Sequence, residues 1–99
     1  MQTLTQNLSI WQRIDAAKRE TKSAQARRLV DFLYAHGPAL TGEVARTCAI
    51  INISSAACAI RPALEKQGLM IIADLPHPLT KNRFGEASMS HQWRLQVIR

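Results

Sequence analysis

The adjacent residues Ser54 and Ser55 are candidate nucleophiles, because activated serine hydroxyls carry out acyl transfer. No histidine or lysine stands at a spacing that would activate either hydroxyl. The chain also lacks a glycine-rich phosphate loop, an H-E-x-x-H motif and a G-x-S-x-G motif. Its seven acidic residues are scattered, and no two of them are forced onto one helix face near a histidine. We therefore expect no enzyme activity and interpret the serines as helix-start residues.

Two cysteines and two histidines are the candidate metal ligands. Cys48 and Cys58 lack the C-x-x-C spacing, and helical periodicity places both on buried faces, although a disulfide or metal pair is an alternative. His77 and His91 flank a polar loop, but no third ligand accompanies them. We expect no metal and no other cofactor. Two reduced, buried cysteines are typical of the cytoplasm, which is the expected compartment.

The chain carries 13 lysines and arginines against seven acidic residues, a net charge of +6. Such a charge is the electrostatic signature of a protein that binds a polyanion. Residues 1–23, 24–69 and 70–99 each contribute +2, so folding must gather the basic residues if they serve one partner. No apolar run is long enough for a membrane helix, and the N-terminus lacks the pattern of a secretory signal. We expect no membrane association.

Residues 39–70 must position any binding residues, and they are predicted to form two short helices joined by a turn. Thr41 is the expected N-cap of the first helix, because its hydroxyl can accept from the amides of the first turn. Val44, Ala45 and Cys48 follow at helical spacing and form an apolar face. The turn after them holds two further candidates for burial, Ile50 and Ile51.

The second helix is bounded by cap residues and interrupted by a proline. Asn52, Ser54 and Ser55 all offer an N-cap, and Gly68 can adopt the left-handed conformation that ends a helix. Pro62 lacks an amide donor and its ring clashes with the carbonyl four residues back, so we expect a kink or a helix restarted at Pro62. The apolar face of this helix comprises Ala57, Ile60, Ala63 and Leu64.

This stretch resembles the helix-turn-helix half of winged-helix DNA-binding domains. The resemblance rests on Leu40-Thr41-x-x-Val44-Ala45, on Ser54-Ser55, and on Leu64-Glu65-Lys66-Gln67-Gly68-Leu69-Met70. With its flanks it covers residues 24–99, and it implies that the second helix presents Ser54 and Ser55 to the major groove. The sequence departs from the pattern at Pro62 and in residues 54–59, which hold few long polar side chains able to read base edges.

Residues 4–20 are predicted to form a helix that precedes this core. Leu4, Leu8, Trp11 and Ile14 recur along one stripe of it. One interpretation is that the stripe packs on the core of its own domain. The other is that Leu8, Trp11 and Ile14 form a homodimer contact, which the resemblance favours because many winged-helix regulators dimerise through an added helix.

Residues 24–36 are predicted to form the next helix, capped by Ser23 and ended by Gly37-Pro38. Basic residues gather around its start, where they are either phosphate contacts or a solvated face. Arg46 points away from the apolar face of the following helix. The expected phosphate contacts of this region and the second helix are Arg28, Arg46 and Arg61.

Two apolar stretches near the C-terminus are predicted strands. Residues 69–75 follow the Gly68 stop, and residues 91–99 alternate apolar and polar side chains. A loop of about fifteen residues joins them, and loops of that length are often functional. At its tip Lys81, Asn82 and Arg83 are expected to contact the DNA backbone or minor groove, the alternative being a solvated loop.

We therefore expect a mostly α fold with a small β-hairpin (α+β), namely a winged helix-turn-helix with an additional N-terminal helix. A single domain is expected over residues 1–99, with the accessory helix at 1–22, the three-helix core at 23–69 and the β-hairpin wing at 70–99. The expected function is that of a small cytoplasmic transcriptional regulator that binds double-stranded DNA. The alternative is a module that binds a protein partner, because a helix face of small residues can pack closely against another protein.

Overall fold

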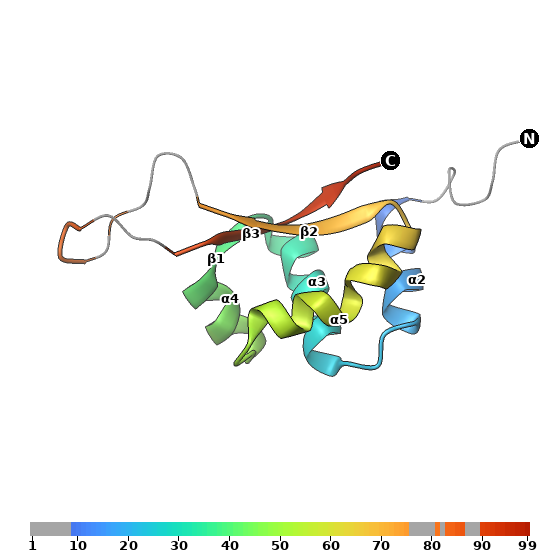
Figure 1. The fold of residues 1–99 in the computed structure, drawn as a ribbon, viewed down its shortest axis with the longest axis horizontal. Coiled ribbons are helices and arrows are strands. Elements are labelled where there is room, and N and C mark those ends of the chain that lie inside the picture. Colours follow the sequence, from blue (N-terminus) through green and yellow to red (C-terminus); the bar gives the residue numbers. More distant parts are fainter. Residues whose placement is uncertain (1–8, 76–80, 82, 87–89) are drawn as a thin grey trace, which may run out of the picture.

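The computed structural model describes residues 9–75, 81, 83–86 and 90–99. In this part of the chain a layer of helices lies beneath a three-stranded antiparallel sheet (Figure 1). The expectation of an α+β fold with more helix than strand is thereby confirmed. The elements are α2 (Ile10–Arg19), α3 (Ala24–His36), β1 (Ala39–Leu40), α4 (Thr41–Cys48), α5 (Ile53–Lys66), β2 (Leu69–Asp74) and β3 (Gln92–Val97).

A reciprocal pair of hydrogen bonds sets the start of α2. The Ser9 hydroxyl accepts from the Gln12 amide at 3.2 Å, and the Gln12 side-chain oxygen accepts from the Ser9 amide at 2.9 Å. This capping box satisfies two amides that would otherwise have no partner at the helix end. α2 therefore begins at Ile10, and the predicted start near Leu4 lies outside the described residues.

The boundaries of α3 are those predicted from the sequence. Ser23 caps the helix by accepting from the Ala26 amide at 3.1 Å. Gly37, with a φ of 91°, lies in the region that favours glycine and stops the helix after His36. α3 is thus fixed at both ends by local chemistry.

The start of α4 differs from the expectation, because Thr41 is the first helical residue and not its N-cap. Leu40 occupies the cap position and makes no side-chain capping bond. The Thr41 hydroxyl instead donates to the His91 carbonyl at 3.2 Å and accepts from the Trp93 indole N–H at 2.9 Å. Thr41 therefore fastens the beginning of α4 to β3.

Residues 49–52 join α4 to α5, and the two helices meet at 82°. Ala49 takes a left-handed conformation (φ 54°), and Asn52 caps α5 by accepting from the Ser55 amide at 3.0 Å. Ile50 is buried as predicted, but Ile51 is 97% exposed, so its predicted burial is wrong. No single described helix is long and apolar enough to span a membrane, although α4 and α5 taken together reach that length and composition.

The sheet contains one strand that the sequence pattern did not reveal. β3 lies in the middle, with β1 on one side and β2 on the other, so Trp93 pairs with both Ala39 and Ala73. β2 and β3 occupy the predicted stretches and pair in an antiparallel register from Leu69 opposite Val97 onward. β1 has only two residues, too few for the two-residue alternation that identifies a strand.

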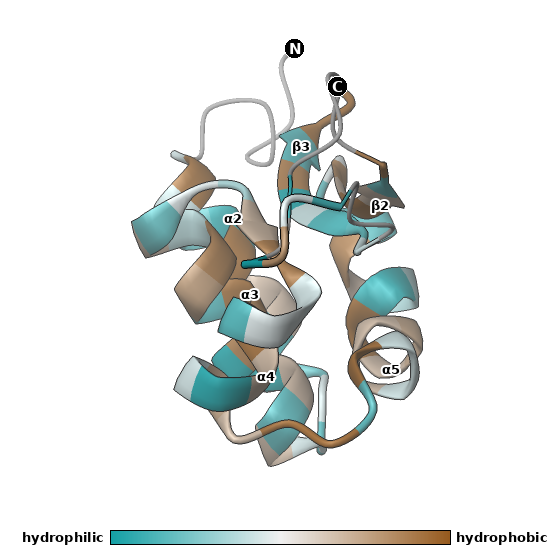
Figure 2. Ribbon diagram, turned by 90° about the vertical axis from the view of Figure 1, so that its left-hand side faces the viewer, coloured by the Kyte–Doolittle hydropathy of each residue, from teal (hydrophilic) through white to brown (hydrophobic). Residues whose placement is uncertain are grey.

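One hydrophobic core connects the helices to the inner face of the sheet. Figure 2 shows that hydrophobic and hydrophilic residues share every helix, as expected for helices with one buried face. Burial of these side chains is the main contribution to the stability of the fold. The largest fully buried residues are Leu29, Val30, Val44, Ile60, Leu64, Leu69 and Ile71.

Candidate nucleic-acid interface

As far as Pro62, the outer face of α5 is built from small, uncharged side chains. Ile53, Ala57 and Ile60 are buried on the inner face, and the exposed positions recur along the other side of the helix. Because Asn52 supplies the cap, the hydroxyls of the exposed serines make no hydrogen bond to another described residue. The exposed residues on this face are Ser54, Ser55, Cys58, Ala59 and Pro62, followed in the last turn of the helix by the charged Glu65 and Lys66.

Pro62 does not interrupt α5, which runs as one helix from Ile53 to Lys66. The prediction of a helix restarted at Pro62 is therefore wrong. The proline is exposed, so its ring lies on the outer face and leaves the packing of the inner face intact. The carbonyl of Cys58, four residues back, loses only its usual backbone donor.

Two of the predicted phosphate contacts have partners inside the protein. The Arg28 side chain donates from Nε to the Cys48 carbonyl at 2.8 Å and from Nη2 to the Ala49 carbonyl at 3.4 Å. These carbonyls end α4, where a cation is favoured by the helix dipole. Arg61 is half-buried and donates from Nη2 to the Ile71 carbonyl at 3.3 Å, which links α5 to β2. Both arginines therefore stabilise the fold and are less available to a phosphate.

Three other predicted contacts are exposed cations. The side chains of Arg46, Lys81 and Arg83 make no hydrogen bond or ion pair to any described residue. The Arg83 guanidinium lies 4.9 Å from the centre of the Phe84 ring, a cation–π contact. Phe84 is 71% exposed and was not selected from the sequence, although an aromatic residue beside a basic tip is a usable signal. Asn82 lies outside the described residues.

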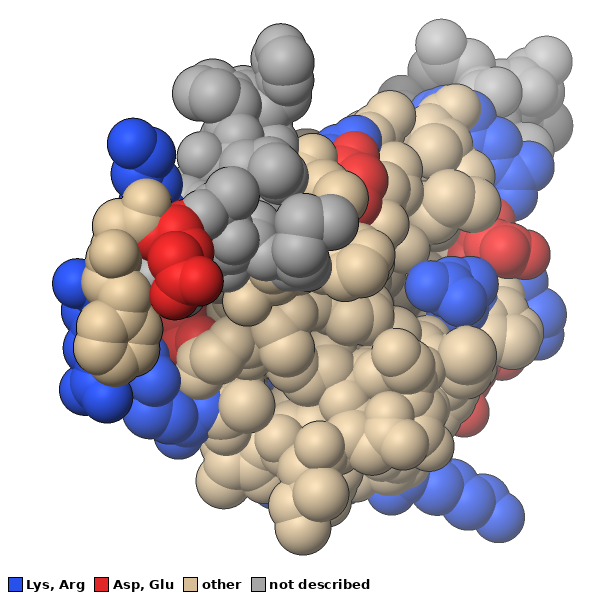
Figure 3. Space-filling model, turned by 60° about the vertical axis from the view of Figure 1, so that its left-hand side comes forward, with Lys and Arg blue, Asp and Glu red and all other residues tan. Residues whose placement is uncertain are grey.

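The charges on the strands are partly neutralised. Arg94 of β3 donates from Nη1 to both carboxylate oxygens of Asp74 on β2, at 2.9 and 2.8 Å. Figure 3 shows a side of the molecule on which a broad uncharged area is bordered by lysine and arginine side chains and, beside several of them, by aspartate and glutamate side chains. Any polyanion bound on this side would therefore be attracted by the basic groups at the edges and repelled by the acidic groups beside them, with uncharged groups facing its centre.

The residues predicted to form a dimer contact do not share one exposed surface in the structure. Ile14 is 3% exposed and belongs to the core of its own domain, so it offers almost no surface area to a second copy. This corrects its assignment to a dimer contact, and the physical reason is that α2 packs on α5 and α3 through Ile14 and Ala17. Trp11 is 58% exposed, and Leu8 lies outside the described residues.

The two cysteines have opposite environments. Cys48 is buried as predicted, whereas Cys58 is exposed on the outer face of α5, so its predicted burial is wrong. Both are free thiols. Burial raises the pKa of the Cys48 thiol above its ordinary value of 9.0, and the nearby Arg28 only partly opposes this.

We expect iodoacetamide at pH 8 to label Cys58 alone in the folded protein, because the reactive thiolate must be formed and accessible. Mass spectrometry of the intact chain should show one adduct under native conditions and two in denaturant. A Cys58→Ser variant should take up no label while folded; rapid labelling of that variant would contradict the burial of Cys48.

The free energy of unfolding should fall as the pH rises above 9.0, since the folded state holds the Cys48 proton more tightly than the unfolded chain.

No group of three or more histidine, cysteine, aspartate or glutamate side chains among the described residues is arranged to hold a metal ion. His77, one of the two histidines considered as ligands, lies outside those residues. Compared with known proteins, the chain matches no family model, no curated protein and no solved structure.

Proposed function

We propose that this chain is a winged-helix protein that binds double-stranded DNA and acts in the cytoplasm as a transcriptional regulator. The observation that carries the proposal is the order α3–β1–α4–α5–β2–β3, with the sheet order β1-β3-β2 and two helices that meet at 82°. The residues described between β2 and β3, orange in Figure 1, project beyond the helices at the end where α4 lies. This arrangement offers a helix and a basic loop to the same partner.

In this proposal the first turns of α5 enter the major groove, which is wide enough for a helix. Ser54 and Ser55 are exposed and their hydroxyls can donate to or accept from base edges or phosphates. Lys81 and Arg83 on the wing, together with Arg46 on α4, neutralise phosphates. Such contacts supply most of the affinity and carry no sequence information themselves.

The test is a titration of the full chain with random-sequence duplex DNA over a series of salt concentrations. Lys81→Ala/Arg83→Ala should reduce the slope of log K against log salt by about 2, since each neutralised phosphate contributes about 0.9. Arg46→Ala should reduce it by about 1. The matched control is Arg19→Ala/Lys66→Ala, which removes the same charge from two ion-paired residues and should leave the slope nearly unchanged.

Equal losses of slope in the wing variant and the control would contradict the assignment of these contacts, because only net charge would then matter. Absence of binding at low salt would reject the DNA-binding function itself. In that case the second candidate applies, a protein-interaction module. The observation in its favour is Ile51, which is 97% exposed and stands next to the uncharged outer face of α5.

A further inference from the structure

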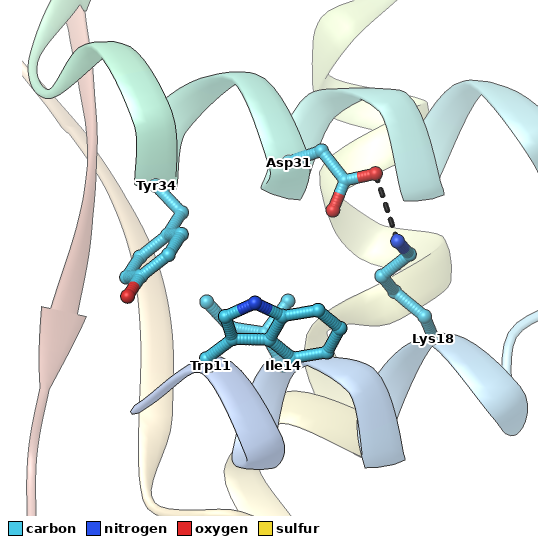
Figure 4. Close-up of a pocket in the computed structure, with 5 residues that line it drawn as sticks. All are labelled: Trp11, Ile14, Lys18, Asp31 and Tyr34. Carbon is cyan, nitrogen blue, oxygen red and sulfur yellow. Dashed lines mark hydrogen bonds and ion pairs between the residues drawn. The ribbon is translucent and has the colours of Figure 1, made fainter. Parts of the chain in front are cut away.

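A cavity of about 300 Å³ lies between α2 and α3, and none of the residues that line it is a proposed DNA contact. Figure 4 shows that α2 supplies one side of it and α3 the other. Its volume is at the lower end of the range of small-molecule sites. The lining residues are Trp11, Ile14, Lys18, Asp31 and Tyr34.

The apolar part of the cavity is largely aromatic and open to solvent. Ile14 is 3% exposed and belongs to the hydrophobic core, so it provides a fixed apolar surface. Trp11 is 58% exposed and Tyr34 47% exposed, and their rings come from different helices. Two of the five aromatic residues in the chain are thus left uncovered at one place. Stacking of a flat apolar group against rings in this position is energetically favourable.

The other end of the cavity is polar and electrically balanced. Lys18 Nζ donates to Asp31 Oδ2 at 2.8 Å, and this ion pair spans the two helices (Figure 4). The ammonium group has further N–H donors, and Asp31 Oδ1 has no partner among the described residues. A donor and an acceptor are therefore held side by side, with no net charge between them.

We propose that this cavity binds a neutral, planar bicyclic heteroaromatic ligand that carries a donor and an acceptor on one edge, the pattern of a purine base. The ring system stacks against Trp11 and Tyr34, while its N–H donates to Asp31 and its carbonyl or ring nitrogen accepts from Lys18. This site does not depend on the proposed DNA binding, because none of its residues belongs to that interface.

Because the Lys18–Asp31 ion pair has no net charge, it favours a neutral polar ligand over a charged or a purely hydrocarbon one. An anionic ligand attracted to the Lys18 ammonium would also lie close to the Asp31 carboxylate, which is only 2.8 Å from that ammonium, and a cationic ligand attracted to the carboxylate would lie close to the ammonium. A purely hydrocarbon ligand would bury the free acceptor and donors without replacing their hydrogen bonds to water. A neutral edge with adjacent donor and acceptor avoids both penalties.

The test uses inosine and 1-methylinosine, which differ by a methyl group in place of the N1–H donor. The ¹⁵N-labelled full chain has two tryptophans, so its two indole N–H signals serve as reporter and control. Inosine should shift the Trp11 signal with a Kd of roughly 0.1–1 mM, as expected for a small ligand. The Trp93 signal should stay in place, because that N–H is bonded to Thr41 inside the protein. 1-Methylinosine should bind about tenfold more weakly.

Asp31→Ala should weaken inosine binding by about tenfold, because the acceptor is lost. The matched control is Asp15→Ala, which removes the carboxylate of the other ion pair on α2, outside the cavity. Equal affinity for the two nucleosides, or equal effects of the two aspartate variants, would overturn the proposed edge recognition. Absence of any Trp11 shift at millimolar inosine would overturn the site. DNA titration of the same variants is a separate readout, so either proposal can fail alone.

Discussion

Gly68→Ala is expected to lower the free energy of unfolding by about 2–4 kcal/mol, because the substitution combines backbone strain with a steric clash. Gly68 has a φ of 75°, where a side chain is disfavoured. A Cβ at this position would lie 2.8 Å from the Arg99 carbonyl oxygen and 2.9 Å from Arg99 Cγ. The carbonyl belongs to the backbone and is held in place by a hydrogen bond that it accepts from Arg13 Nη1 at 2.8 Å. Urea unfolding followed by circular dichroism measures the loss.

The position of Gly68 explains why relaxation is costly. Its amide donates to the Glu65 carbonyl at 3.0 Å, and its carbonyl accepts from the Ile98 amide at 2.8 Å. It therefore joins the end of α5 to the end of β3. Moving Gly68 away from Arg99 would disturb both hydrogen bonds.

Gly42→Ala is the matched control for this prediction. Gly42 lies inside α4 without a positive φ, and its added Cβ would meet only Arg46 Nη1, at 3.8 Å. Alanine is favoured over glycine in a helix by about 0.5–1 kcal/mol, so this variant should be more stable than the wild type. If both alanine variants were destabilised equally, the clash at Gly68 would not be the cause.

Local chemistry made the α3 helix and the paired strands predictable. Ser23 supplies an N-cap and Gly37 a stop, and both signals act within a few residues of the helix end. The alternation through Trp93 and Leu95 similarly identifies β3. Thr41 had an equally good local signal but took a different role, because Trp93 and His91, about fifty residues away, offered its hydroxyl other partners.

The errors around α5 come from small rotations that sequence periodicity does not resolve. Ile50 and Ile51 are adjacent and equally apolar, and the left-handed conformation of Ala49 decides which of them turns inward. Cys58 follows the buried Ala57, and a helix rotates by about 100° from one residue to the next. A hydrophobic face therefore predicts a helix more reliably than it predicts the edges of that face.

The sequence identified basic residues of the candidate interface that stay exposed, namely Arg46 on α4 and two residues of the loop between β2 and β3. Lys81 and Arg83 lie where no neighbouring element competes for them among the described residues. Arg28 and Arg61 instead bond to carbonyls 20 and 10 residues further along the chain, and those partners are brought near only by folding. The aromatic cavity on α2 and α3 was missed for the same reason, since Trp11 and Tyr34 meet only in the folded domain.

Pro62→Ala is expected to raise the free energy of unfolding by about 1–3 kcal/mol, because proline in a helix interior costs roughly 3 kcal/mol relative to alanine. The gain should fall below that limit, since the Cys58 carbonyl freed by Pro62 lies on the exposed side of α5 and can bond to water. Ser54→Ala, on the same face, is the control and should gain at most about 0.5 kcal/mol from helix propensity. Urea unfolding of the two variants measures the difference. Equal stability of Pro62→Ala and the wild type would contradict this prediction, because it would mean that α5 accommodates the proline without an energetic cost.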